Sequence, residues 1–119
     1  MILLGLCASA ADKPADVKIL EFSARHDNGA IVIDGRVAVT AGKPISQMML
    51  TFDFLAAGHS SVATKQFVVD EPRLVPGEES AFHLSASAPP RAVEIRIRAY
   101  RNGSIEVRLD NAGPHPIGE

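Results

Sequence analysis

The amino-acid sequence predicts an all-β domain in which seven strands form a sandwich of two sheets. Short segments alternate apolar and polar residues, as strands do when successive side chains point to opposite faces of a sheet. Gly, Pro, Asn or Asp separate these segments at intervals typical of a sandwich. Apolar residues nowhere keep a helical spacing for more than a turn or two, so a second sheet must cover the first.

The chain has 119 residues, which suits one domain. Its formal net charge of −2 differs from the strongly basic balance of proteins that bind nucleic acid, so we expect no nucleic-acid partner. Residues 1–10 are uncharged and apolar and end in Ala8-Ser9-Ala10, a pattern that signal peptidase accepts. We therefore expect a signal peptide over 1–10, a linker over 11–16, and a secreted or periplasmic protein. The apolar run is too short to span a bilayer, and no transmembrane segment is expected in the mature domain.

Cys7 is the only cysteine. Cleavage after Ala10 would leave a mature domain without a thiol, which excludes thiol catalysis, disulfides and cysteine-bound zinc. Lipid attachment at Cys7 is the alternative. We favour the signal peptide, because the residue before a lipoprotein cysteine is small and Leu6 is not.

The strands of the mature part are each bounded by turn residues. In the first, the apolar parity changes after Ile19, which predicts a β-bulge. Asn28-Gly29 predicts a tight turn after it, because both residues accept a positive φ. The segment 61–70 has no clean alternation, which predicts an edge strand or one that changes sheets. The seven strands cover 17–25, 30–40, 47–55, 61–70, 80–87, 92–100 and 104–110, and residues 111–119 should form an extended Pro/Gly tail.

Parity also decides which residues face the core. Odd positions of the second strand are Ile31, Ile33, Gly35, Val37 and Val39, and even positions of the third are Met48, Leu50, Phe52 and Phe54. We expect both sets to be buried, because they form the apolar half of each alternating pattern.

The last hairpin, 92–110, has apolar odd positions on both sides of Asn102-Gly103. Opposed residues of an antiparallel pair point to the same face, so odd residues must pair with odd ones. A two-residue Asn-Gly turn would break this rule and bury Arg108 beside Ile97. We therefore predict a three-residue loop, Arg101-Asn102-Gly103, with Gly103 left-handed. This register pairs Ile97 with Val107 inside, and Arg98 with Glu106 and Arg96 with Arg108 outside.

Three blocks of the sequence carry a family resemblance: Gly35-x-Val37, Leu50-x-Phe52-x-Phe54 followed by Gly58, and Leu74-x-Pro76-Gly77-Glu78 followed by Phe82. Over residues 35–100 the chain resembles the FxLYD-type domains, which are immunoglobulin-like modules of bacterial and archaeal envelope proteins. Its last two strands are also similar to fibronectin type III domains. Phe54-Leu55 stands where the family has Tyr-Asp. The resemblance implies an immunoglobulin-like sandwich without catalysis and without a family-wide ligand site.

The sequence contains no motif for catalysis, phosphate binding or metal binding. A Gly-x-Ser-x-Gly elbow, a Gly-rich phosphate loop and a calcium loop are all missing. The histidines lack the spacings that present two imidazoles to one metal, and we expect them to be solvated; they are His26, His59, His83 and His115. We therefore expect no enzyme, no cofactor and no metal.

A basic face on the last hairpin is the main candidate site. Residues 91–109 contain five arginines and two glutamates, a net charge of +3. The outward residues Arg96, Arg98 and Arg108, with Tyr100 beside them, could bind an acidic protein, an anionic glycan or a lipid headgroup. The alternative is a solvated face whose arginines pair with Glu94, Glu106 and Asp110.

Two other surfaces are candidates for docking. Met49, Leu55 and Val32 are apolar residues on outward parities, and together they would form a patch. The edge of segment 61–70 could accept a strand from a partner. From these features we predict an interaction or accessory module of the bacterial cell envelope that binds a protein through the basic face or the strand edge. A purely structural spacer domain is the alternative.

Overall fold

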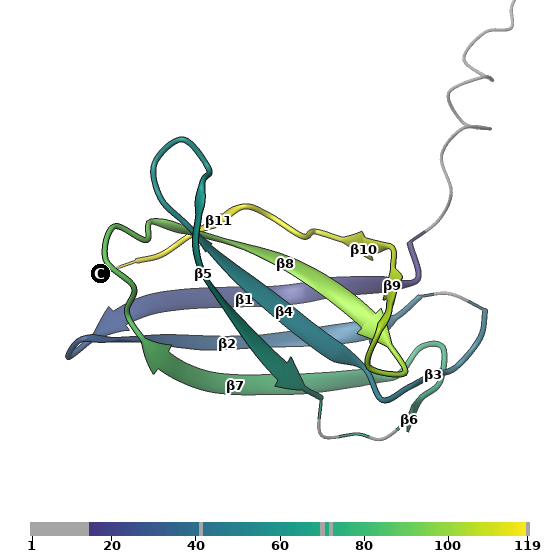
Figure 1. Ribbon diagram of the computed structural model, residues 1–119. Helices are drawn as coiled ribbons and strands as arrows, with labels where there is room; N and C mark the ends of the chain where they lie inside the picture. The colour runs from purple at the N-terminus through teal and green to yellow at the C-terminus, as the bar shows by residue number, and fades with distance from the viewer. Residues whose placement is uncertain (1–14, 41, 70, 72, 119) are drawn as a thin grey trace, which may run out of the picture.

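The structure is a computed structural model that describes residues 15–40, 42–69, 71 and 73–118. The predicted signal peptide and most of the predicted linker lie outside these residues. Within the described ranges the protein is all-β, as predicted, with eleven strands and no helix (Figure 1). None of the described residues forms a helix that could cross a membrane.

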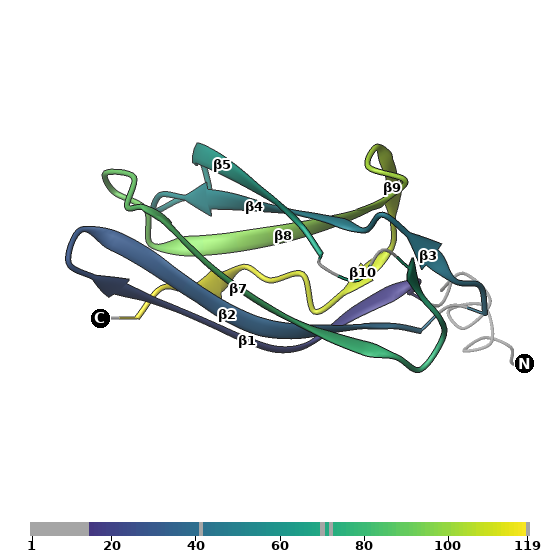
Figure 2. The same cartoon turned by 90° about the horizontal axis from the view of Figure 1, so that it is seen from below.

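Two sheets face each other as two layers (Figure 2). The first has the order β10-β1-β2-β7, in which β1, β2 and β7 are antiparallel and β10 runs parallel to β1. Its strands are β1 (Val17–Asp27), β2 (Ala30–Val39), β7 (Glu79–Ser87) and β10 (Leu109–Asp110).

The second sheet has the order β11-β8-β4-β5, and β9 also pairs with β8. A separate pair, β3 with β6, forms a small ladder beside the two layers. The remaining strands are β3 (Ile45–Ser46), β4 (Met49–Leu55), β5 (Ser61–Val68), β6 (Arg73–Leu74), β8 (Glu94–Arg101), β9 (Ile105–Val107) and β11 (His115–Pro116).

The core lies between the two layers, and the predicted parity is confirmed. Ile31, Ile33, Val37 and Val39 of β2 are buried, and so are Met48, Leu50, Phe52 and Phe54 in and before β4; Gly35 is half-buried. Neighbouring phenylalanine rings join the layers, with centroids 5.8 Å apart for Phe52 and Phe82 and 6.5 Å apart for Phe67 and Phe82. Aromatic pairs at such separations add to the burial of the rings.

Two local predictions in β1 and β2 are confirmed. The register of the β1–β2 pair shifts between Ile19 and Glu21, so Leu20 is the extra residue of a β-bulge. The turn between the strands has positive φ at Asn28 (50°) and Gly29 (84°), as a tight two-residue reversal requires.

The predicted register of the last hairpin is wrong by two residues. Odd residues do pair with odd ones, but Val107 lies opposite Ala99 instead of Ile97, and Glu106 lies opposite Tyr100 instead of Arg98. The loop is 102–104, and Gly103 is left-handed with φ of 75° as expected.

The position of this loop is set by a distant part of the chain. The amide of Asn102 donates to the carbonyl of Ser46 at 2.9 Å, and that of Gly103 donates to the carbonyl of Gln47 at 3.2 Å. These bonds hold the loop against the segment before β4. Ile105, the first residue of β9, is consequently left at the rim of the sandwich, where 45% of its surface is exposed.

The predicted strand 104–110 is divided between the two sheets. β9 pairs with β8, the chain crosses over at Arg108, and β10 pairs with β1. Arg96 and Arg108 are therefore not opposed, and the pairing predicted for them is wrong. On β4, the residue opposite Arg96 is Asp53.

The domain also extends beyond its predicted limits of 17 and 110. The amide of Thr40 donates to the carbonyl of Asp16 at 2.9 Å, so the end of the predicted linker is part of the sandwich. Residues 111–118 do not form a separate tail, because β11 pairs with β8 and the amide of Gly118 donates to the carbonyl of Ala24. No local pattern in the sequence indicates this, since these bonds join residues far apart in the chain.

Candidate functional site

The outer face of the second sheet carries most of the predicted site residues. Opposed residues in an antiparallel sheet share a face, so the pairing of β5, β4 and β8 orders their outward side chains in rows. We refer to these rows as the arginine face. They are Val68–Met49–Tyr100, Gln66–Thr51–Arg98 and Thr64–Asp53–Arg96.

The first row is an apolar stripe across three strands. Val68 is 62% exposed, and Met49 and Tyr100 are half-buried. Met49 and Tyr100 are direct cross-strand neighbours, although they belong to two separate surfaces in the prediction from the sequence. Glu106 of β9 lies on the other side of Tyr100 and ends the row with a carboxylate.

Asp53 fixes the position of Arg98. The Nη2 atom of Arg98 lies 3.1 Å from Oδ2 of Asp53, and the hydroxyl of Thr64 donates to Oδ1 at 3.0 Å. The Asp53 side chain is 14% exposed and that of Arg98 is 41% exposed, so the carboxylate end of this ion pair is the part shielded from water. The Nε atom of Arg98 is buried and has no hydrogen-bond partner among the described residues.

Arg96 and Arg108 are exposed, and neither forms an ion pair with any described residue. Together with Arg98 they line an open hollow of about 930 Å³, which Glu106 and Asp110 also line. The structure thus brings the three predicted arginines to one hollow and places Tyr100 in the neighbouring apolar row. The two carboxylates make the hollow less basic than the sequence suggested.

The arginines do not have the ion pairs that the sequence analysis considered as the alternative. Arg98 pairs with Asp53, and Glu94 lies 3.1 Å from Nδ1 of His59. Asp53 is the site residue that the sequence analysis missed. Its outward parity in the central strand was visible, but its neighbours on β8 depend on the strand order.

The predicted apolar patch of Met49, Leu55 and Val32 does not form. Leu55 is buried, with 2% of its surface exposed. Val32 lies opposite Arg25 and Ser85 in the other sheet, so it cannot share a surface with Met49.

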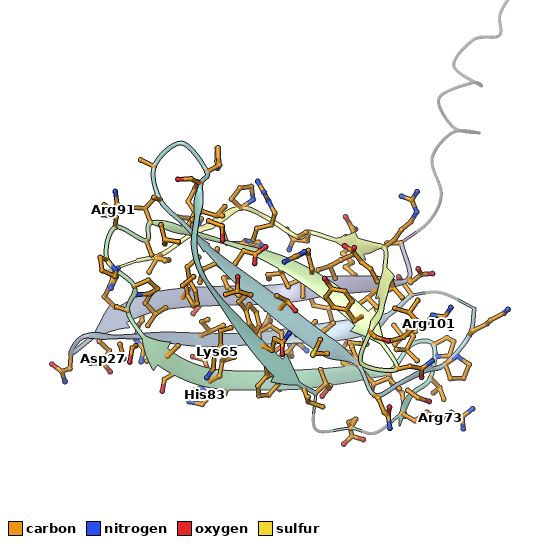
Figure 3. All side chains as sticks on the ribbon, in the orientation of Figure 1. Asp27, Lys65, Arg73, His83, Arg91 and Arg101 are labelled. Carbon is orange, nitrogen blue, oxygen red and sulfur yellow. The ribbon has the colours of Figure 1, made fainter. Side chains whose placement is uncertain are left out.

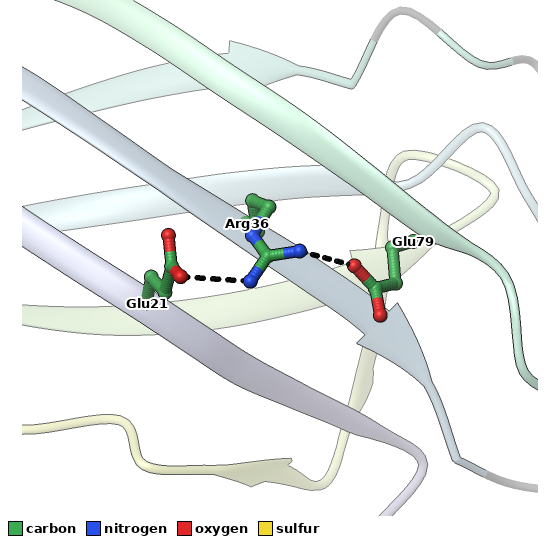
Figure 4. A network of polar contacts seen from close by, with 3 residues as sticks. All are labelled: Glu21, Arg36 and Glu79. Atoms are coloured by element: carbon green, nitrogen blue, oxygen red, sulfur yellow. Dashed lines mark hydrogen bonds and ion pairs between the residues drawn. The ribbon is translucent and has the colours of Figure 1, made fainter.

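The outer face of the first sheet has its central charges paired with one another. Arg36 of β2 donates to Glu21 of β1 at 2.7 Å and to Glu79 of β7 at 2.6 Å (Figure 4). The hydrogen bond from Arg36, and then its charge, lower the pKa of Glu21 below the ordinary carboxyl value. His83 and Asp34 form a further pair in the next row.

The strand β5 lies at a sheet edge, as predicted for 61–70, and ends at Val68. Lys65 lies opposite Phe52, a core residue, so it occupies an inward position of this edge strand. Figure 3 shows Lys65 between the ribbons of β5 and β7. An inward charge on an edge strand opposes pairing with a further strand, so this edge is a poor site for strand addition.

No group of three or more His, Cys, Asp or Glu side chains that could hold a metal ion occurs among the described residues.

His115 is not a solvated tail residue, because its ring packs on Phe22 with centroids 4.6 Å apart.

No protein-family model matches the chain, and no curated protein matches it. The solved structures that match the chain include the following two. The alkylpurine DNA glycosylase AlkC of Pseudomonas fluorescens, bound to DNA containing an abasic site analog, is 16% identical, with a TM-score of 0.49 over 88% of this chain and 31% of its own. The GH20 exo-β-N-acetylglucosaminidase of Vibrio harveyi, in complex with N-acetylglucosamine, is 12% identical, with a TM-score of 0.46 over 87% of this chain and 18% of its own. The chain thus spans less than a third of the length of either protein.

Proposed function

We propose that the protein is an exported, noncatalytic interaction module of the bacterial cell envelope, and that it binds a protein partner through the arginine face. The observation that carries this proposal is the contrast between the two outer faces. On the first sheet the charged groups at the centre pair with one another. On the second, Arg96 has no ion pair with a described residue, and the same face carries the apolar row Val68–Met49–Tyr100, in which Val68 is exposed.

This contrast matters for the free energy of binding. An arginine that is already paired must lose that partner, or share it, when it meets a ligand, whereas Arg96 has no such pair to break. Tyrosine and arginine are also the residues that most often dominate binding energy at protein interfaces. An apolar row through Tyr100 and Met49, with Arg98 in the next row and Arg96 in the row after it, suits a partner that presents an apolar side chain and a carboxylate on one surface.

We also propose that the domain is immunoglobulin-like and of the FxLYD type. Taking β9 as the last of seven principal strands, three of them, β1, β2 and β7, face four, β9, β8, β4 and β5. The block Leu74-x-Pro76-Gly77-Glu78 with Phe82 supports this proposal. Leu74 and Phe82 are buried, and Gly77 has a φ of 90° in the turn between β6 and β7.

A capture experiment with a matched control tests the binding proposal. The full chain is used as cross-linked bait in an envelope extract, beside the variant Arg96→Glu/Tyr100→Ala and the control Arg25→Glu/Val32→Ala. The control makes the same two kinds of change in one row of the opposite face. We expect the native chain and the control to hold the same partner, and the arginine-face variant to bind it at least tenfold more weakly.

Other outcomes contradict this proposal in different ways. A partner that all three proteins hold equally would place the binding surface elsewhere. If no partner is captured, the structural spacer is the better function. That alternative is supported by Asp53, Glu106 and Asp110, which offset much of the charge of the three arginines on this side of the molecule.

A further inference from the structure

Residues 108–118, which we refer to as the closing segment, run along one side of the sandwich between β1 and β8. Figures 1 and 2 show this segment in yellow, lying beside both layers. It pairs first with β1 through Leu109 and Asp110, then with β8 through His115 and Pro116. It returns to β1 at Gly118, which donates to the carbonyl of Ala24 at 2.8 Å and accepts from the amide of His26 at 2.9 Å.

One contact of the closing segment is made to the bulge in β1. The bulge interrupts the β1–β2 ladder after Ile19, and a bulge leaves backbone groups that need other partners. The side-chain amide of Asn111 donates to the carbonyl of Ile19 at 3.0 Å. A strand without an amide donor at this position would leave that bond unmade.

Three further positions of the closing segment make contacts that depend on the residue present. Gly113 has a φ of 102°, and a Cβ there would lie 2.9 Å from the carbonyl oxygen of Ile95, so no other residue fits without strain. His115 places its ring on that of Phe22, and Ile117 packs against the core. We refer to the space between β1 and β8 that the closing segment fills as the channel. These contacts make the channel selective for the sequence of the segment that fills it, in addition to pairing with its backbone.

The closing segment is less firmly held than the strands it touches. Its apolar residues Leu109 and Ile117 are only partly buried, whereas Val17, opposite Leu109, and Ile95, opposite His115, are fully buried. Segments with few buried apolar contacts open at a lower free energy than the core. Opening would expose the backbone groups of β1 and β8 together.

We propose that the channel between β1 and β8 is a sequence-selective peptide-binding site, which the closing segment fills in its own molecule and which the same segment of a second copy can fill instead. In an exchanged dimer, each copy places its closing segment in the channel of the other copy and makes the same contacts as in the closed monomer. The equilibrium between monomer and exchanged dimer therefore depends on protein concentration and on the conformation at the crossover residue, Arg108. This site is independent of the arginine face and goes beyond the proposed interaction function.

A disulfide placed across the channel reports which copy supplies the segment. Glu94 and Pro116 are opposed in the β8–β11 pair, and the amide of Ile117 donates to Val93, so the 94–116 pair is of the closer, non-hydrogen-bonded kind that suits a disulfide. The test uses the full chain with Glu94→Cys and Pro116→Cys, after Cys7→Ser. The control pair is Val32→Cys with Ser85→Cys, opposed residues of β2 and β7 that no exchange of the segment separates. This pair is also non-hydrogen-bonded, because the β2–β7 bonds in this register are made by odd residues of β2, such as Val39 to Glu78.

Each reduced protein is incubated over a range of concentrations, then oxidised and run on a non-reducing gel. For the channel pair we expect a disulfide-linked dimer whose fraction rises at least severalfold from the lowest to the highest concentration, while the control pair stays within single chains. A channel pair that links only within single chains at every concentration would overturn the proposal.

A second measurement does not depend on the cysteine variants. The Gly113→Ala change weakens the chain's own segment, because the new Cβ meets the carbonyl of Ile95. The full-length variant should therefore bind a labelled peptide of residues 108–118 at least tenfold more tightly than the native chain does. It should bind the same peptide with Asn111→Ala more weakly. Equal or undetectable binding of the native peptide by both proteins would contradict the proposal.

Discussion

The ring of Phe82 lies over Gly35, in the space that a side chain at position 35 would need. A Cβ on Gly35 would be 2.4 Å from Cζ of Phe82 and 2.5 Å from the carbonyl oxygen of Glu21. Phe22, Gly35 and Phe82 are opposed residues of β1, β2 and β7. The missing side chain in the middle of this row lets the Phe82 ring turn into the core, where it meets Phe52.

We predict that Gly35→Ala lowers the free energy of unfolding by about 1–3 kcal/mol, because the added methyl overpacks a core whose neighbours cannot all move. Urea denaturation measures the effect. Gly42→Ala is the control, since no atom lies within 4 Å of its Cβ position and its φ is not positive; its stability should stay within about 0.5 kcal/mol of the native value. Equal stabilities for the two variants would show that Phe82 does not depend on Gly35.

Lys65→Val should make the protein self-associate. The substitution removes the inward charge from the edge strand β5 and leaves a longer apolar edge, on which strands of other copies can pair. Light scattering against protein concentration detects the change. Lys43→Val, at an exposed position outside the strands, changes the net charge equally and should scatter like the native protein. If both variants scatter alike, net charge and not the edge position of Lys65 controls solubility.

The ion pair between Arg36 and Glu21 should appear in the pH dependence of stability. Because this pair lowers the pKa of Glu21, its contribution is present above the ordinary value of 4.5 and is lost as the pH falls through the lowered pKa. In Glu21→Gln the stability should therefore fall less over this acidic range than in the native protein. Thermal unfolding at a series of pH values measures the two curves. Glu106→Gln, whose carboxylate has no ion pair with a described residue, should leave the native curve unchanged.

The features that the sequence predicted correctly depend on neighbours within one or two strands. The alternation in β2 and β4 identifies the core face because the strand period is fixed at two. The change of parity after Ile19 identifies the bulge, and Asn28-Gly29 identifies the turn, because each depends on the local backbone alone.

The features that the sequence could not provide depend on distant contacts. Parity allows two registers for the last hairpin that differ by two residues, and the choice between them is made by the carbonyls of Ser46 and Gln47. The ion pair of Arg98 with Asp53 requires the knowledge that β8 lies beside β4. On the arginine face, the side chains were therefore identifiable from the sequence, but their neighbours were not.

The parallel course of the closing segment beside β1 has a mechanical consequence. Leu109 lies next to Val17 and Gly118 next to Arg25, so the two segments run in the same direction. A tensile force applied at residues 17 and 118 acts along both segments and shears the bonds of Leu109, Asp110 and Gly118 together. Thermal opening from Gly118 can break them one at a time. The same segment that a second copy can replace in a resting molecule would therefore resist extension when the domain is under load.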